Sequence, residues 1–199
     1  MKRAQGLFLE ALELNESALN ILIAENNPDN QEVLLAKNDL AGTLGTLGRY
    51  DEALQLQEEV LALSKKIFGV KHSQTITAMN NLAITLNNFG DYDEALELQK
   101  GVLALSKEIF GVKHSRTITA MNNLAYTLNE VRTFDDLAGS YDEALELQRE
   151  VLKLSKETFG DKHPDTLLAM NNLALTLNEF GGYNKALELQ EEVLTLRAC

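Results

Sequence analysis

The chain has 199 residues, of which 45% are hydrophobic and 24% charged, and only two are proline, a composition typical of a globular, helix-rich protein. Its formal net charge of −12 argues against nucleic acids and anionic membrane surfaces as partners, because phosphate groups are bound by a concentrated excess of Lys and Arg. The single cysteine, Cys199, has no partner for an intramolecular disulfide, so nothing indicates an oxidising compartment.

The N-terminal segment does not have the pattern of a signal peptide or of a membrane span. Lys2 and Arg3 precede a short apolar stretch, but Glu10 and Glu13 interrupt it. We therefore expect a cytoplasmic protein. Residues from about 4 to 25 match a later helical pattern of the chain and predict an amphipathic helix.

A fixed period organises the rest of the chain. The string Tyr-Asp-Glu-Ala-Leu begins at Tyr50, Tyr92 and Tyr141, and the variant Tyr-Asn-Lys-Ala-Leu begins at Tyr183, which gives steps of 42, 49 and 42 residues. A second string, Met-Asn-Asn-Leu-Ala, keeps the same steps. The step of 49 is therefore one repeat that carries an insertion at residues 131–137.

Each repeat contains two amphipathic helical patterns, which we name A and B in chain order. Glycines follow them where a left-handed residue usually ends a helix: Gly90, Gly139 and Gly181 after A patterns, and Gly69, Gly111 and Gly160 after B patterns. We predict repeats at about residues 29–68, 73–110, 115–159 and 164–197. With the first helix, this makes about nine helices in an all-α fold, an α-solenoid without an internal domain boundary.

Three strings of the repeats are Asn80-Asn81-Leu82-Ala83, Gly90-Asp91-Tyr92-Asp93-Glu94-Ala95, and the connector Gly160-Asp161-Lys162-His163-Pro164-Asp165-Thr166. In these strings the chain resembles tetratricopeptide repeats, specifically the 42-residue type of kinesin light chains. The resemblance covers essentially the whole chain. It implies one domain of residues 1–199, a right-handed superhelix of helix-turn-helix repeats, and a protein or peptide ligand in the concave groove that the A helices line.

The A patterns have a second stripe that their apolar core stripe does not use. Asn amides on this stripe can donate to and accept from the backbone of an extended peptide, and Tyr126, between Ile84 and Leu175, can form an apolar pocket. The candidate groove residues are Asn38, Thr77, Asn80, Ile84, Asn87, Thr119, Asn122, Tyr126, Asn129, Asn171, Leu175 and Asn178.

A structural role for these residues stays open. For the adjacent Asn81, Asn123 and Asn172, we favour hydrogen bonds that lock neighbouring repeats together. For Asn80, Asn122 and Asn171, that structural role and ligand binding are about equally supported. Tyr126 can equally fill a gap between two A helices.

We expect no enzyme activity, no cofactor and no metal site. His72, His114 and His163 recur once per repeat, and helices that pack about 8–10 Å apart cannot bring them to one metal. The role that we predict for each of them is a hydrogen bond in the loop or at the helix start. Glycine-rich phosphate loops, nucleophile elbows and Cys-x-x-Cys motifs are absent from the sequence.

The sequence leaves two other functions open, a self-assembling repeat array and the sensor part of a larger signalling protein. The last helix still carries an apolar stripe, so we expect self-association through Leu189, Val193 and Leu196. Finally, because seven residues are close to two helical turns, we expect the third A helix to continue through most of residues 131–137. The alternative is a flexible surface loop, which repeat proteins commonly carry on one edge.

Overall fold

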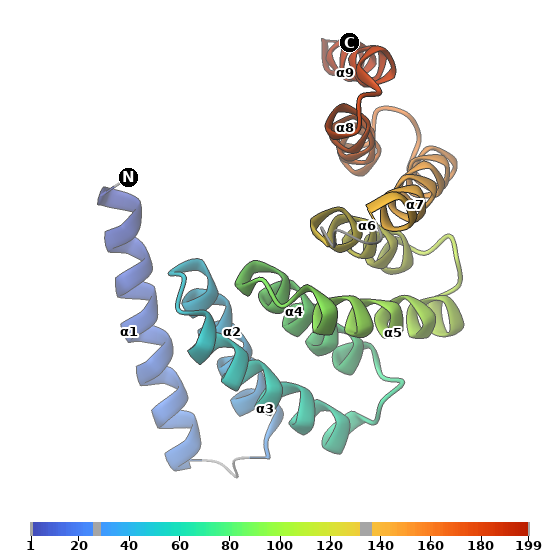
Figure 1. Ribbon diagram of the computed structural model, residues 1–199. Coiled ribbons are helices and arrows are strands. Elements are labelled where there is room, and N and C mark those ends of the chain that lie inside the picture. The colour runs from blue at the N-terminus through green and yellow to red at the C-terminus, as the bar shows by residue number, and fades with distance from the viewer. Residues whose placement is uncertain (1, 26–28, 132–136, 199) are drawn as a thin grey trace. The chain divides into compact units, whose positions relative to one another are not determined.

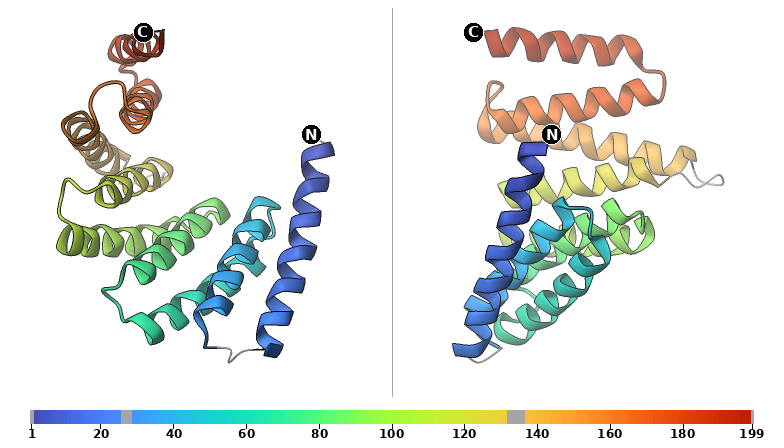
Figure 2. Two further views of the ribbon diagram at one scale, coloured as in Figure 1. Left: turned by 180° about the vertical axis from the view of Figure 1, so that it is seen from behind. Right: turned by 90° about the vertical axis from the view of Figure 1, so that its left-hand side faces the viewer.

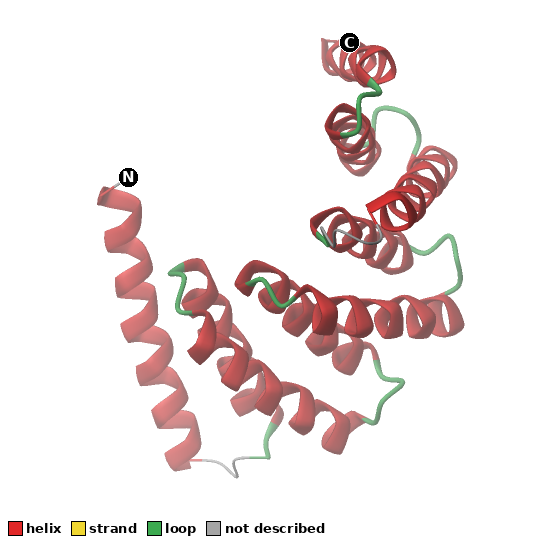
Figure 3. Ribbon diagram, viewed as in Figure 1, coloured by secondary structure: helices red, strands yellow, loops and turns green. Residues whose placement is uncertain are grey.

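The computed structural model describes residues 2–25, 29–131 and 137–198, and in these residues it contains nine α-helices and no strand (Figure 3). The helices are α1 (Lys2–Glu25), α2 (Gln31–Thr46), α3 (Tyr50–Phe68), α4 (Ser73–Phe89), α5 (Tyr92–Phe110), α6 (Ser115–Glu130), α7 (Leu137–Phe159), α8 (Pro164–Glu179) and α9 (Tyr183–Ala198). The predicted fold class and the first helix are confirmed. The A helices are α2, α4, α6 and α8, and the B helices are α1, α3, α5, α7 and α9.

The chain divides into two compact units, residues 1–98 and residues 99–199, with the boundary inside α5. In the first unit α1 packs on α2, α2 on α3 and α3 on α4 (Figure 1). In the second unit α6 packs on α7, α7 on α8 and α8 on α9, and Figure 2 shows α8 and α9 side by side. Within each unit, these helices therefore pack on their neighbours in the chain, as in an α-solenoid.

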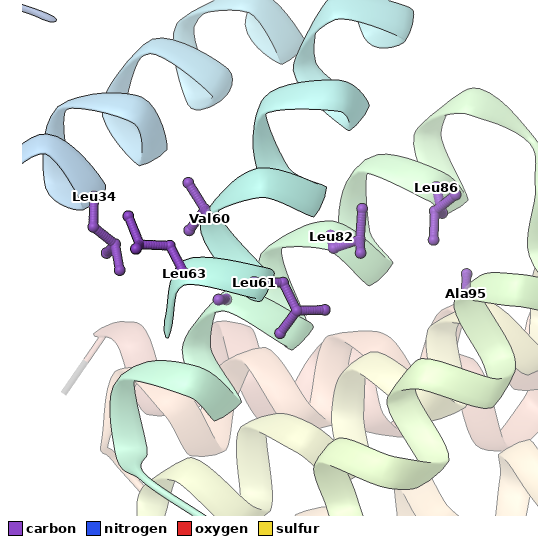
Figure 4. Close-up of a cluster of buried hydrophobic side chains, with 8 residues drawn as sticks. Leu34, Val60, Leu61, Leu63, Leu82, Leu86 and Ala95 are labelled. Atoms are coloured by element: carbon purple, nitrogen blue, oxygen red, sulfur yellow. The ribbon is translucent and has the colours of Figure 1, made fainter. Parts of the chain in front are cut away.

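Apolar side chains from successive helices form the core of the first unit (Figure 4). Leu34 of α2 and Val60 and Leu61 of α3 share one cluster with Leu82 and Leu86 of α4. Full burial of each such side chain stabilises the fold by about 1.5–3 kcal/mol. The periodic stripes in the sequence are thus the residues that hold neighbouring helices together.

The histidine of each connector caps the A helix that follows it. Nδ1 of His72, His114 and His163 accepts the backbone N–H two residues ahead, at 3.2 Å in each case. Each ring also stacks on the last residue of the preceding B helix, with ring centroids 4.7–4.9 Å apart. The predicted role at the helix start is confirmed.

Glycines end the helices at all the predicted positions except one. Gly69, Gly90, Gly111, Gly160 and Gly181 have positive φ. The prediction for Gly139 is wrong, because Gly139 lies inside α7.

Next to the insertion, the helix that is longer than its counterparts α3, α5 and α9 is the B helix that follows, and not the A helix before it. Here α6 ends at Glu130, and Val131, with φ −69° and ψ 87°, has left the helical region. The predicted continuation of the third A helix is therefore wrong at Val131, and the rest of that prediction, at residues 132–136, lies outside the described residues. Whereas α3, α5 and α9 begin at the repeat tyrosine, α7 begins at Leu137, before Tyr141.

The apolar stripe of α9 is covered by its neighbours. Val193 is buried against Leu167 and Met170 of α8, and Leu189 and Leu196 pack on the same cluster. The apolar surface expected at these three residues is therefore not exposed. The large apolar side chains that α9 does expose after Tyr183 are Leu187 and Leu194, which correspond in the repeat to Leu54 and Leu61 of α3.

Candidate functional site

In the first unit, α4 exposes part of the predicted stripe. Thr77 and Ile84 are exposed, and Asn80, like Asn38 on α2, is half-buried. Asn87 is only 7% exposed, so its side chain is not available at the surface.

In the second unit, α6 and α8 expose a larger apolar surface. Tyr126 of α6 is 53% exposed, and Leu168 and Leu175 of α8 are 54% and 56% exposed. Thr119 and Asn178 are also exposed, whereas Asn122 and Asn171 are half-buried between them. Large apolar side chains in a group on a helix face indicate a surface that another molecule covers.

Asparagine pairs join neighbouring A helices. Nδ2 of Asn81 on α4 donates to Oδ1 of Asn38 on α2, and Nδ2 of Asn172 on α8 donates to Oδ1 of Asn122 on α6, both at 2.9 Å. The structural interpretation of Asn81 and Asn172 is therefore confirmed. It also extends to Asn38 and Asn122, whose carbonyl groups accept these bonds.

A further hydrogen bond connects α6 and α8 near their C-terminal ends. Nδ2 of Asn129 on α6 donates to Oγ1 of Thr176 on α8 at 2.6 Å. The amide nitrogen of Asn129 is therefore engaged within the protein. Two side-chain hydrogen bonds thus hold α6 and α8 together along the face that carries Tyr126 and Leu175.

A cavity of about 180 Å³ lies between α6 and α8, with α7 behind it. Thr119 and Asn122 of the predicted stripe line it, together with Leu168 of α8. Ile118 of α6, Val151 and Phe159 of α7 and Ala169 of α8 add apolar walls. The residues contributed by α7 were missed in the sequence, because they follow the B-helix pattern and nothing local shows that they meet a neighbouring A helix.

Ionic contacts lie at the edge formed by the connectors. Nζ of Lys113 is 3.0 Å from Oε2 of Glu157, and this hydrogen bond lowers the pKa of the Glu157 carboxyl from its ordinary value. The guanidinium of Arg116 lies over the ring of Phe110, 5.3 Å from its centroid. These charged groups are placed at the ends of the helices and not along the face of α6 and α8.

The described residues contain no group of three or more His, Cys, Asp or Glu residues placed to hold a metal ion. In the same part of the chain, no helix combines the length and the apolar composition that crossing a membrane requires.

The family model described as "Tetratricopeptide repeat" matches residues 1–66, 32–100, 74–132 and 137–198. The chain belongs to the tetratricopeptide repeat family. Tetratricopeptide repeats are generally scaffolds for protein interaction and are typically not enzymes. A search of curated proteins finds no match.

Solved structures of tetratricopeptide proteins are similar over nearly the whole chain. A Podosopora anserina protein described as a kinesin light chain with nearly identical TPR-like repeats has 26% identity and a TM-score of 0.79, covering 98% of this chain and 89% of its own. BtubC (BKLC) from P. vanneervenii has 20% identity and a TM-score of 0.76, covering 99% and 76%.

A Rap protein crystallised with Competence and Sporulation Factor has 15% identity and a TM-score of 0.57, covering 96% of this chain and 59% of its own. At this identity the likeness concerns the fold alone.

Proposed function

We propose that this protein is a non-catalytic scaffold that holds a segment of a partner protein on the exposed faces of its A helices. The observation that carries the proposal is the surface of α6 and α8, where Tyr126, Leu168 and Leu175 are each more than half exposed and Leu168 lines a side-chain-sized cavity. Burial of these side chains by a partner would supply the free energy of binding.

The arrangement of polar groups supports the same proposal. The pair Asn122–Asn172 and the bond from Asn129 to Thr176 fix the spacing of α6 and α8 from within the protein. A surface held in this way needs little reordering when it binds, which favours affinity. The half-buried Asn171 and the exposed Thr119 then add donors and acceptors for a peptide backbone.

Self-assembly through the last helix is less well supported. Leu189, Val193 and Leu196 pack on α8, so only Leu187 and Leu194 are large exposed apolar residues along that helix beyond its first residue. On α8, by contrast, the exposed Leu168 lines a cavity.

The first prediction concerns peptides selected from a random displayed library for binding to the whole chain. The double substitution Tyr126→Ala and Leu175→Ala should weaken their binding at least about tenfold, because it removes the two central apolar contacts. Both side chains are exposed, so the melting temperature should change little. Fluorescence anisotropy and circular dichroism measure the two effects.

The matched control is Leu187→Ala, because Leu187 has the same 56% exposure as Leu175 but lies on α9, a B helix. It should leave peptide affinity unchanged. Binding that survives the double substitution and is lost with Leu187→Ala would refute the proposed function.

A further inference from the structure

Charge is distributed unequally between the helices of the second unit. In α6 the charged side chains are Arg116, near its start, and Glu130, its last residue, and in α8 they are Asp165 and Glu179, at the same places. The residues between them, 117–129 and 166–178, contain no Lys, Arg, Asp or Glu. By contrast, the B helix between them, α7, contains Asp142, Glu143, Glu146, Arg149, Glu150, Lys153, Lys156 and Glu157.

The uncharged stretches include exposed side chains as well as buried ones. Exposed helix faces of globular proteins normally carry charged and polar residues, and a helix without them is usually buried. Here Thr119, Tyr126, Leu168 and Leu175 are exposed although the stripe has no charged group. The surface of α6 and α8 is therefore apolar and neutral-polar over its whole central length.

Such a surface discriminates against charged partners. A charged side chain that leaves water needs an opposite charge or several hydrogen bonds, and without them its burial is unfavourable. The central surface offers only amides, hydroxyls and apolar groups. The charges at the helix ends are Arg116 and Glu130 on α6 and Asp165 and Glu179 on α8, so three of the four are negative, and all four lie outside the central surface.

The cavity between α6 and α8 adds a requirement of size and polarity. Its volume is about 180 Å³, which suits one side chain and not a folded element. Ile118, Val151, Phe159 and Leu168 provide apolar walls, Asn122 and Thr119 lie at the same cavity, and the exposed Asp165 is the charged residue of its lining. An apolar side chain would enter it, while the partner backbone would meet the amides and hydroxyls.

We infer that the surface of α6 and α8 recognises an uncharged, extended peptide segment that places one aliphatic or aromatic side chain in this cavity. This inference rests on the proposed function and specifies its partner. Because apolar burial and neutral hydrogen bonds supply the affinity, binding should depend little on ionic strength.

The experiment uses peptides selected with the whole chain from a random displayed library, followed by affinity measurements between about 50 and 500 mM NaCl. We expect the selected peptides to lack charges in their binding segment, to require one apolar residue, and to change in Kd by less than about twofold over this range. Replacement of that apolar residue by Asp should abolish binding.

A pair of variants places the same new charge at two sites. Leu168→Asp puts a carboxylate at the cavity and should weaken binding more than about tenfold. Leu194→Asp, at a residue of α9 that is 66% exposed, should have no effect. Circular dichroism of both variants checks that the fold is kept.

The outcomes separate this inference from the proposed function. If the selected peptides need Lys, Arg, Asp or Glu and lose affinity steeply with salt, while Tyr126→Ala with Leu175→Ala still abolishes binding, the uncharged partner is wrong and the scaffold role stands. Binding that survives all substitutions on α6 and α8, or a selection that yields no peptide, overturns both.

Discussion

Single residues in this protein have their roles set by where the repeat places them. His114 is a clear case, since its Nδ1 accepts the N–H of Arg116 and its ring stacks on Phe110 at 4.9 Å. A free N–H at the start of a helix is otherwise unsatisfied, so the histidine stabilises α6 directly. The same pair of contacts recurs at His72 and His163.

We predict that His114→Ala lowers the free energy of unfolding by about 1 kcal/mol, because it removes the acceptor that caps α6. Urea unfolding followed by circular dichroism measures the change, and the backbone amide of Arg116 should exchange faster with solvent. His114→Asn is the matched control, since Asn can accept the same bond and should restore most of the stability. Equal losses in both variants would show that the stack with Phe110, and not the cap, is what stabilises the helix.

The asparagines show how far residue patterns predict a site. Their recurrence on the A helices is evident in the sequence, and so is the possibility that some of them lock repeats together. Which ones do so depends on geometry between helices: Asn172 reaches Asn122, and Asn129 reaches Thr176, across a distance that no local pattern encodes. The exposed apolar residues Tyr126 and Leu175 were found, but the walls supplied by α7 were not.

At the scale of elements, the helices follow from the apolar period and the glycines, and deviations occur where the period is interrupted. Gly139 has the repeat position of a helix-ending glycine, yet it lies in α7, which begins at Leu137. The residues before Tyr141 extend the B helix, and a glycine without a positive φ can be part of a helix. Sequence alone does not decide which of two adjacent helices receives an inserted turn.

We predict that substitution of two glycines by alanine changes the stability of the protein in opposite directions. Gly90, at the end of α4, has φ +99°, so Gly90→Ala should destabilise the protein by about 1–2 kcal/mol. Gly42 lies inside α2 with no atom within 4 Å of an added Cβ, so Gly42→Ala should stabilise it by about 0.5–1 kcal/mol. Urea unfolding of both variants tests this, and a stabilising Gly90→Ala would contradict the assigned helix end.

At the scale of the whole molecule, the charges are numerous and mostly of one sign. The chain has 30 acidic and 18 basic residues, and the charges are scarce along the central parts of α6 and α8. Exposed ion pairs such as Lys113–Glu157 and Lys156–Glu192 contribute little to stability. The net charge of −12 therefore acts mainly as a repulsion within the folded chain.

We predict from this repulsion that stability and peptide affinity respond differently to the same salt series. Added NaCl screens the like charges, so the melting temperature should rise between about 50 and 500 mM, by about 2–4 °C for each 1 kcal/mol gained. NaCl is preferred to sulfate, which stabilises proteins by exclusion from their surface.

The double substitution Glu188→Gln and Glu191→Gln, at two exposed residues of α9, should raise the melting temperature at low salt and reduce its increase with added NaCl. A melting temperature that falls with NaCl would mean that ion pairs outweigh the repulsion. Affinity for an uncharged peptide should stay constant over the same series, since few of the charges being screened lie on the surface of α6 and α8.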